Sequence, residues 1–152
     1  MYFNLRQLFY LFFTLLFSQT ISSQNIFEQK YMGCNTSRFT TESDSIMVLP
    51  SQNIKSFFEE NIRKDILKQL EGDLSFQIIV DEAGNSCLLS YENNTNQKDS
   101  RLQFKQQIDE TLKWKRPGQR TSVIVALEFF NGSFKVYRIG MSREKGYHFI
   151  SD

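Results

Sequence analysis

A single histidine limits the chemistry that this chain could carry out. The 152-residue sequence holds one histidine, His148. A nucleophilic serine or cysteine is usually activated by a histidine, and a catalytic zinc is usually held by several imidazole, thiolate or carboxylate groups. With one imidazole, neither a catalytic triad nor a His-rich metal site is readily assembled. We therefore expect His148 to be a surface or partly packed residue, and we expect no enzyme activity, no metal and no cofactor.

Two neighbouring carboxylates, Asp81 and Glu82, are the next groups that could act as an acid and a base. They stand in the segment Asp81-Glu82-Ala83-Gly84, which separates two apolar runs and has the composition of a turn. An exposed turn desolvates a carboxyl group very little, so a useful shift in its pKa is hard to produce there. We interpret both residues as turn residues.

The segment Lys113-Trp114-Lys115-Arg116 combines an aromatic ring with positive charge, as single-strand nucleic-acid binders do. The whole chain, however, holds 18 Lys and Arg against 17 Asp and Glu, a formal charge of +1. Phosphate binding requires clustered positive charge, so we predict no nucleic-acid partner. Trp114 is better explained as a core residue at the end of a helix.

Cys34 and Cys87 are the only cysteines, and two interpretations of them stay open. In an oxidising compartment they could form a disulfide. Otherwise they are two unpaired thiols, with Cys87 serving as a small buried apolar residue. Three Asn-x-Ser/Thr triplets begin at Asn35, Asn93 and Asn131 and matter only in a cell that glycosylates secreted proteins.

Residues 1–23 have the pattern of a secretory signal peptide. Arg6 precedes the apolar run Leu8–Phe17, and small polar residues follow it up to Ser23. The run is roughly half of the about 20 apolar residues that a spanning helix requires. We expect cleavage between Thr20 and Gln24, and hence a periplasmic or extracellular protein without a stable membrane span. The alternative is an uncleaved N-terminal anchor.

The elements of the mature chain are organised around one β-hairpin. Residues 74–80 alternate as a strand with one buried face, and residues 86–92 return from the turn. The register that places apolar on apolar residues pairs Val80 with Asn85, Ile78 with Cys87, Phe76 with Leu89, and Leu74 with Tyr91.

Two helices flank this hairpin in the sequence. Apolar residues recur at helical spacing after Ser51, a good N-cap, and Gly72 can end that helix. Ser100 begins a second helix, with Gln103 completing a capping box. Residues 122–130 form a third strand, and the turn Asn131-Gly132 leads to a fourth over residues 134–139.

These elements predict an α+β fold in which three to four antiparallel strands, with one parallel-related crossover, pack on two helices. The helix between the second and third strands makes those two strands parallel, which gives the order second, first, third, fourth. Both helices lie on one face. The domain covers residues 51–139, preceded by a loose arm over residues 24–50 with a short strand near Ile46, and followed by a polar tail over residues 140–152 that frays.

The order of these pieces resembles the C-terminal domain of TonB-type energy transducers over roughly residues 51–130. The likeness rests on Gly72, Leu74, Phe76, Ile78, Val80, Asp81 and Gly84, and then on Lys113, Trp114, Lys115, Pro117 and Gly118. It implies the fold and, as in that family, binding of a partner segment along a strand edge. The chain departs from the family where Lys64-Asp65 replaces a Tyr-Pro pair, where the last strand lacks its proline, and in having no Pro-rich arm, since it holds two prolines.

These observations predict an exported, non-catalytic module that binds a protein partner of the cell envelope. An open sheet leaves a strand edge with unpaired backbone groups, and we expect the partner there, beside Ser86, Leu88, Ser90 and Glu92. A rival for the same edge is the arm near Ile46. The alternative functions are an accessory or truncated energy transducer for outer-membrane transport, and a small secreted enzyme of unknown class.

Overall fold

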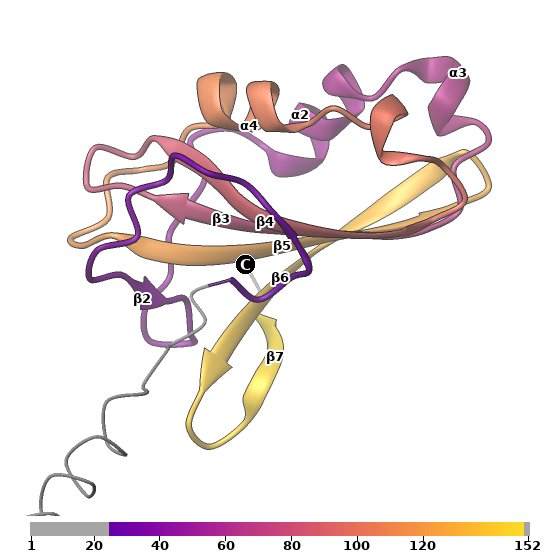
Figure 1. Cartoon of the computed structure of the whole chain (residues 1–152). Helices are drawn as coiled ribbons and strands as arrows, with labels where there is room; N and C mark the ends of the chain where they lie inside the picture. Colours follow the sequence, from indigo (N-terminus) through magenta and orange to yellow (C-terminus); the bar gives the residue numbers. More distant parts are fainter. Residues whose placement is uncertain (1–24, 151–152) are drawn as a thin grey trace, which may run out of the picture.

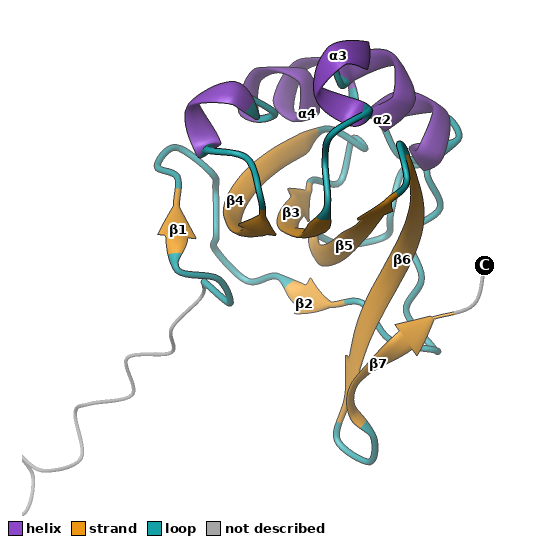
Figure 2. Cartoon of the chain, turned by 90° about the vertical axis from the view of Figure 1, so that its right-hand side faces the viewer, coloured by secondary structure: helices purple, strands orange, loops and turns teal. Residues whose placement is uncertain are grey.

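The computed structural model describes residues 25–150, so the predicted signal peptide lies outside the described residues (Figure 1). In chain order, its elements are β1 (Gln29–Lys30), β2 (Thr40–Thr41), α2 (Ile54–Asn61), α3 (Lys64–Leu67), β3 (Gly72–Val80), β4 (Ser86–Thr95), the 3-10 turn η1 (Asp99–Arg101), α4 (Lys105–Thr111), β5 (Thr121–Phe130), β6 (Ser133–Ser142) and β7 (Gly146–Ile150). The strands form one sheet, and the helices cover one of its faces (Figure 2).

The expected fold class is wrong, because the sheet has seven strands rather than three or four. Its order is β1-β4-β3-β5-β6-β7, and β2 pairs with the beginning of β5. The four strands foreseen from the sequence do lie in the predicted order, with β4 and β5 on either side of β3. The additional strands come from the segments interpreted as a loose arm and a fraying tail. Strand β1 and strand β2 span two residues each, too short to show a period of their own.

The register of the central hairpin also differs from the prediction. The backbone N–H of Asp81 donates to the carbonyl of Asn85 at 3.0 Å, so the turn closes one residue later than expected and Val80 pairs with Ser86. A bulge then shifts the register again, because Gln77 pairs with Ser90 while Ile78 pairs with Leu88. Beyond the bulge Phe76 lies opposite Tyr91, which keeps both rings on the helix side of the sheet.

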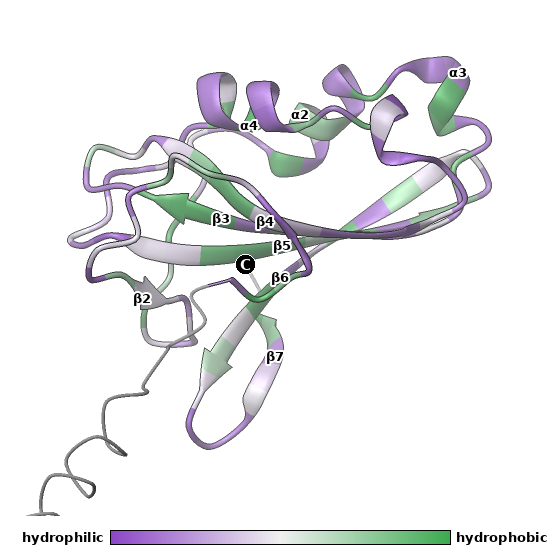
Figure 3. Cartoon of the chain, viewed as in Figure 1, coloured by the Kyte–Doolittle hydropathy of each residue, from purple (hydrophilic) through white to green (hydrophobic). Residues whose placement is uncertain are grey.

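Aromatic rings form the centre of the core between the helices and the sheet. The ring of Phe58 on α2 stacks on Phe76 of β3 at 5.3 Å, and Phe104 meets both rings edge-on, at 5.7 and 5.4 Å. The most apolar stretches of the sheet accordingly lie beneath the helices (Figure 3). Burying aromatic groups of this size dominates the stability of a small core.

The helices are shorter than the sequence predicted. Asn53, not Ser51, caps α2, and its side-chain oxygen accepts a hydrogen bond from the backbone N–H of Ser56 at 3.0 Å. The chain is extended at Ile62, so the expected single helix over residues 51–70 is divided into α2 and α3. Both Ile62 and Ile66 remain buried on the same core, which is why the apolar spacing continues across the break.

Part of the arm, including β2, lies on the side of the sheet away from the helices, whereas β1 lies beside the edge of β4 (Figure 2). Its β2 runs parallel to the first residues of β5, where β6 no longer pairs with β5. The next residue, Glu42, donates its backbone N–H to the Ser122 carbonyl at 3.0 Å and accepts from the N–H of Met141 at 2.8 Å. The arm thereby fills the gap where β5 and β6 diverge. Strand β6 continues past this point and turns into β7, so residues 140–150 do not fray as predicted.

Candidate functional site

The predicted strand edge is closed in the structure. Ser86, Leu88 and Ser90 are buried, with 6%, 1% and 0% of their surface exposed, and of the four predicted residues only Glu92 is exposed. The edge of β4 is taken up by the arm, because β1 pairs with Ser90 and Tyr91, and the N–H of Tyr31 donates to the carbonyl of Leu89 at 2.9 Å. The arm does cover this edge, as the rival interpretation held, but with residues 29–31 rather than with the segment near Ile46.

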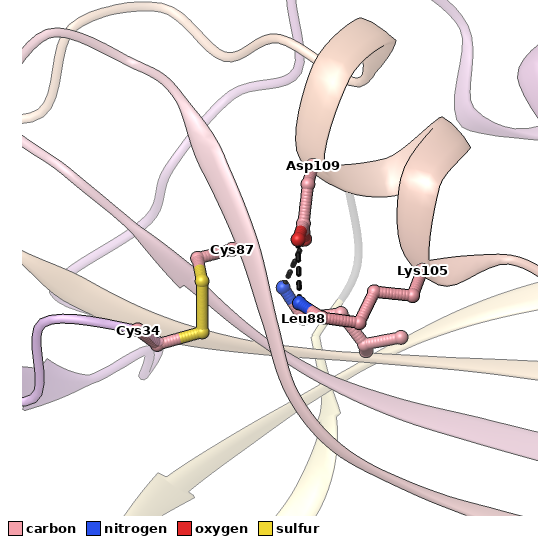
Figure 4. The surroundings of a disulfide bond; sticks show 5 residues. All are labelled: Cys34, Cys87, Leu88, Lys105 and Asp109. Atoms are coloured by element: carbon pink, nitrogen blue, oxygen red, sulfur yellow. Dashed lines mark hydrogen bonds and ion pairs between the residues drawn. A yellow bond between two sulfur atoms is a disulfide. The ribbon is translucent and has the colours of Figure 1, made fainter. Parts of the chain in front are cut away.

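A side chain of helix α4 accepts a hydrogen bond from a further backbone N–H group of the same edge. The backbone N–H of Leu88 donates to a carboxylate oxygen of Asp109 at 2.6 Å, and the second oxygen of Asp109 pairs with Lys105 at 2.5 Å (Figure 4). A buried N–H needs such an acceptor, since leaving it unpaired costs free energy. Asp109 therefore supplies the hydrogen-bond acceptor for this part of the sheet edge.

Ser86 has a structural role on the helix side of the sheet. Its hydroxyl donates to the carbonyl of Leu112 at 2.7 Å and accepts from the indole N–H of Trp114 at 2.8 Å. Trp114 is 3% exposed, which confirms its interpretation as a core residue. The turn before β4 packs against the same tryptophan: Gly84 has a φ of 88°, and a Cβ there would lie 2.2 Å from the Trp114 carbonyl oxygen.

A chain of polar side chains lies beneath the arm. The Ser90 hydroxyl donates to the side-chain oxygen of Gln77 at 2.6 Å, and the Gln77 amide donates to the Ser122 hydroxyl at 3.2 Å. The backbone N–H of Ile26 donates to the same Gln77 oxygen at 2.9 Å, and the N–H of Phe27 donates to the Ser90 hydroxyl at 3.3 Å. These side chains hold the arm by its backbone.

Cys34 and Cys87 form a disulfide that joins the arm to β4 (Figure 4). The structure thus has the bridge and not the two free thiols that were its alternative. The bond lies just before the edge segment that the arm covers, on the opposite side of β4 from Asp109. A disulfide of this kind suits the oxidising compartment that the predicted signal peptide implies.

Two tyrosines line a cleft of about 620 Å³ between the arm and α4. The ring of Tyr31 stacks on Tyr91 at 5.6 Å, and the ammonium of Lys105 lies 5.1 Å from the centre of the Tyr31 ring. Burial raises the pKa of Tyr31, and burial together with a hydrogen bond to Asp99 raises the pKa of Tyr91. Both shifts favour the protonated form of the phenols.

His148 fastens the last hairpin to the arm. Its Nε2 lies 3.1 Å from the Asp44 carboxylate, which also pairs with Lys145 at 2.6 Å. The hydrogen bond from Lys145, followed by that from His148, holds the pKa of Asp44 below its usual value. Among residues 25–150, no three His, Cys, Asp or Glu side chains gather closely enough to hold a metal ion.

The carboxylate pair at the central turn is structural, as predicted. One oxygen of Asp81 accepts from the backbone N–H groups of Ala83 and Asn85, at 2.9 and 2.8 Å, and the other accepts from the Asn85 side chain at 2.9 Å. Glu82 pairs with Arg120 at 3.1 Å. Asp81 thus organises the hairpin that defines the centre of the sheet.

The other edge of the sheet is open. Strand β7 is the last strand in the order, and no strand within residues 25–150 pairs with its outer side. Phe149 is 69% exposed and Tyr147 is 58% exposed. Their cross-strand partners on β6 are Ile139 and Met141, so these four side chains share one face of the hairpin.

A groove of about 330 Å³ adjoins this face, between the beginning of α2 and the β6–β7 hairpin. Phe149 and Ile150 line its hairpin side, and Pro50, Asn53 and Lys55 line the opposite wall. The ring of Phe149 rests against Tyr137 at 5.1 Å. Sequence reasoning missed this surface because the polar composition of residues 140–152 predicts a fraying tail. The available signal was Tyr147 and Phe149, which are two residues apart and follow the turn at Gly146.

None of the helices within residues 25–150 is long and apolar enough to cross a bilayer.

Comparison with known proteins identifies no relative. No protein-family model, no curated protein and no solved structure matches the chain, so its resemblance to TonB-type C-terminal domains stays a prediction.

Proposed function

We propose that this chain is an exported, non-catalytic module that binds a protein partner of the cell envelope by adding an extended segment of that partner to strand β7. The observation that carries the proposal is the contrast between the two ends of the sheet. The β4 edge is covered from Leu88 to Tyr91 by Asp109 and the arm, whereas β7 has no neighbouring strand on its outer side within the described chain.

An uncovered strand edge exposes a row of unpaired backbone groups. Proteins usually blunt such an edge with proline, with charged side chains or with a covering segment. Strand β7, Gly-Tyr-His-Phe-Ile, contains neither proline nor lysine, and the adjacent Lys145 is paired with Asp44. An edge of this composition can pair with a strand of another chain. A binding function would account for an edge that is left unprotected.

The side chains of the hairpin indicate what kind of segment fits. In strand addition, backbone hydrogen bonds provide affinity and the alternate side chains provide selectivity. A strand laid beside β7 would place every second side chain against the rings of Tyr147 and Phe149, which favours apolar or aromatic residues at those positions. The family resemblance seen in the sequence agrees with this mode of binding.

Two serine substitutions in the full mature chain test the proposal. Phe149→Ser removes an aromatic contact at the edge, and Phe130→Ser removes a ring that is 38% exposed at the distant β5–β6 turn. The wild-type chain and the Phe130→Ser control should retain the same partner from an envelope extract. The Phe149→Ser variant should retain at least tenfold less of it. Equal retention by both variants would exclude β7 as the binding surface.

A further inference from the structure

The covered edge of β4 has the geometry of a strand-binding site occupied by the chain's own arm. Strand β1 pairs antiparallel with Tyr91 and Ser90, and Tyr31 continues the pairing to Leu89. The arm is only partly buried where it covers this edge. None of residues 25–41 is fully buried, and Met32 is 90% exposed. Segments with few buried contacts are those that open locally in native proteins.

The contacts that hold the arm depend little on its sequence. Gln77 and Ser90 receive the backbone N–H groups of Ile26 and Phe27, and the carbonyl of Leu89 receives that of Tyr31. Any extended segment carries such N–H groups. A side-chain contact that does depend on the sequence is that of the Tyr31 ring, which stacks on Tyr91 and lies near the Lys105 ammonium. Another segment with an aromatic residue at that place would satisfy the same site.

The disulfide links the arm covalently to β4, so its redox state can control whether the arm remains bound there. Cys34 ends the covering segment, Cys87 lies on the covered strand, and both are partly exposed. On the far side of Cys34, Arg120 donates to the carbonyl and the hydroxyl of Ser37, at 2.8 and 3.1 Å. Opening the bridge would therefore remove the covalent link between residues 25–34 and β4, leaving only their non-covalent contacts there, while the chain stays attached from Ser37 onward.

We propose that the Cys34–Cys87 disulfide is a redox latch: when it is reduced, the arm leaves β4 and the exposed edge accepts an extended, aromatic-containing segment of a partner protein. The reductant is a dithiol. One of its thiolates attacks a sulfur of the Cys34–Cys87 bond to form a mixed disulfide, and its second thiol displaces the remaining cysteine. The dithiol is oxidised to a disulfide, and Cys34 and Cys87 each gain one electron and one proton as thiols.

Amide exchange of the wild-type mature chain, with and without dithiothreitol, tests the opening step. The Tyr31 amide should exchange at least tenfold faster in the reduced chain, while the Ile78 amide in the central strand stays equally protected. Unchanged exchange at Tyr31 would overturn the latch. Loss of protection at Ile78 would also overturn it, since reduction would then unfold the whole sheet. Neither outcome depends on a partner at β7, so this test is independent of the proposed function.

A second measurement tests whether the opened edge accepts a strand. The full chain with Tyr31→Ala and Cys34→Ser has a weakened arm and a free Cys87. The probe is a synthetic peptide of residues 25–36, activated at its own cysteine as a mixed disulfide. It should couple to Cys87 at least tenfold faster than a peptide of the same composition in scrambled order. Equal coupling rates would show that β4 does not select an extended segment.

Discussion

Glu42 and Arg138 form an ion pair in the interior of the protein although they lie 96 residues apart in the sequence. Their side chains are 0% and 2% exposed. Glu42 also accepts from the backbone N–H of Val48 at 2.7 Å, Arg138 donates to the carbonyl of Val48 at 2.7 Å, and its guanidinium lies 5.3 Å from the centre of the Trp114 ring. The pair thereby fixes the arm, the hairpin strand β6 and the core tryptophan to one another.

Removing one partner of this pair should destabilise the fold strongly. Glu42→Ala leaves the Arg138 charge buried, which costs about 3–5 kcal/mol of unfolding free energy. The matched control is Asp65→Ala, which removes the exposed Arg63–Asp65 pair and should cost less than about 1 kcal/mol. Urea unfolding of the three proteins measures both effects. A loss for Glu42→Ala as small as that for Asp65→Ala would contradict the structural role of the buried pair.

Asp109→Ala should lower the stability of the fold, because Asp109 on α4 binds the covered β4 edge. Without the carboxylate, the buried N–H of Leu88 has lost its acceptor, which costs about 1–3 kcal/mol. Glu110→Ala, on the exposed face of the same helix, should change the stability by less than about 0.5 kcal/mol. Thermal unfolding compares the two variants, and Asp109→Asn, which keeps an oxygen at that place, should fall between them. Equal stabilities of Asp109→Ala and Glu110→Ala would contradict this account of the edge.

Acid should weaken the central turn through Asp81. Burial acts to raise the pKa of this carboxyl, but hydrogen bonds from Asn85, Ala83 and Gly84 outweigh it and hold the pKa below the ordinary value of 3.8. A carboxyl whose pKa is lowered by folding stabilises the fold above its unfolded pKa, and that stabilisation is lost as the pH falls through the lower, folded value. The stability difference between wild type and Asp81→Asn should therefore be constant near neutral pH and shrink below about pH 4. An unchanged difference between pH 7 and pH 2 would argue against this role.

Sequence reasoning succeeded where the folding signal is local. The alternation in residues 74–80, the turn residues after it and the helical segment before β5 together predict four strands in the observed order. Asp81 and Trp114 could also be assigned correctly, because a turn aspartate and a tryptophan at the end of a helix have few other uses in a chain with this composition.

The remaining structure depends on contacts between distant residues that leave no periodic pattern. The arm is shaped by the Cys34–Cys87 bond and by the Glu42–Arg138 pair, whose partners are 53 and 96 residues apart. The predicted register failed for two reasons: the turn closes one residue later than expected, and the bulge between Gln77 and Ile78 inserts a further residue that the apolar pattern does not mark. The predicted binding site at the β4 edge was misplaced because a distant segment, the arm, covers that edge. Whether a strand edge is open depends on such contacts between distant residues.

The most direct measurement of the central claim, that β7 receives the partner, is site-specific photo-crosslinking in the native cell envelope. A photoreactive amino acid replaces Tyr147 in one full-length chain and Met32, which is 90% exposed on the arm, in a control chain. The account predicts a discrete covalent adduct with one protein from position 147 and none from position 32. No adduct from position 147 in a folded chain, or the same adduct from both positions, would contradict it.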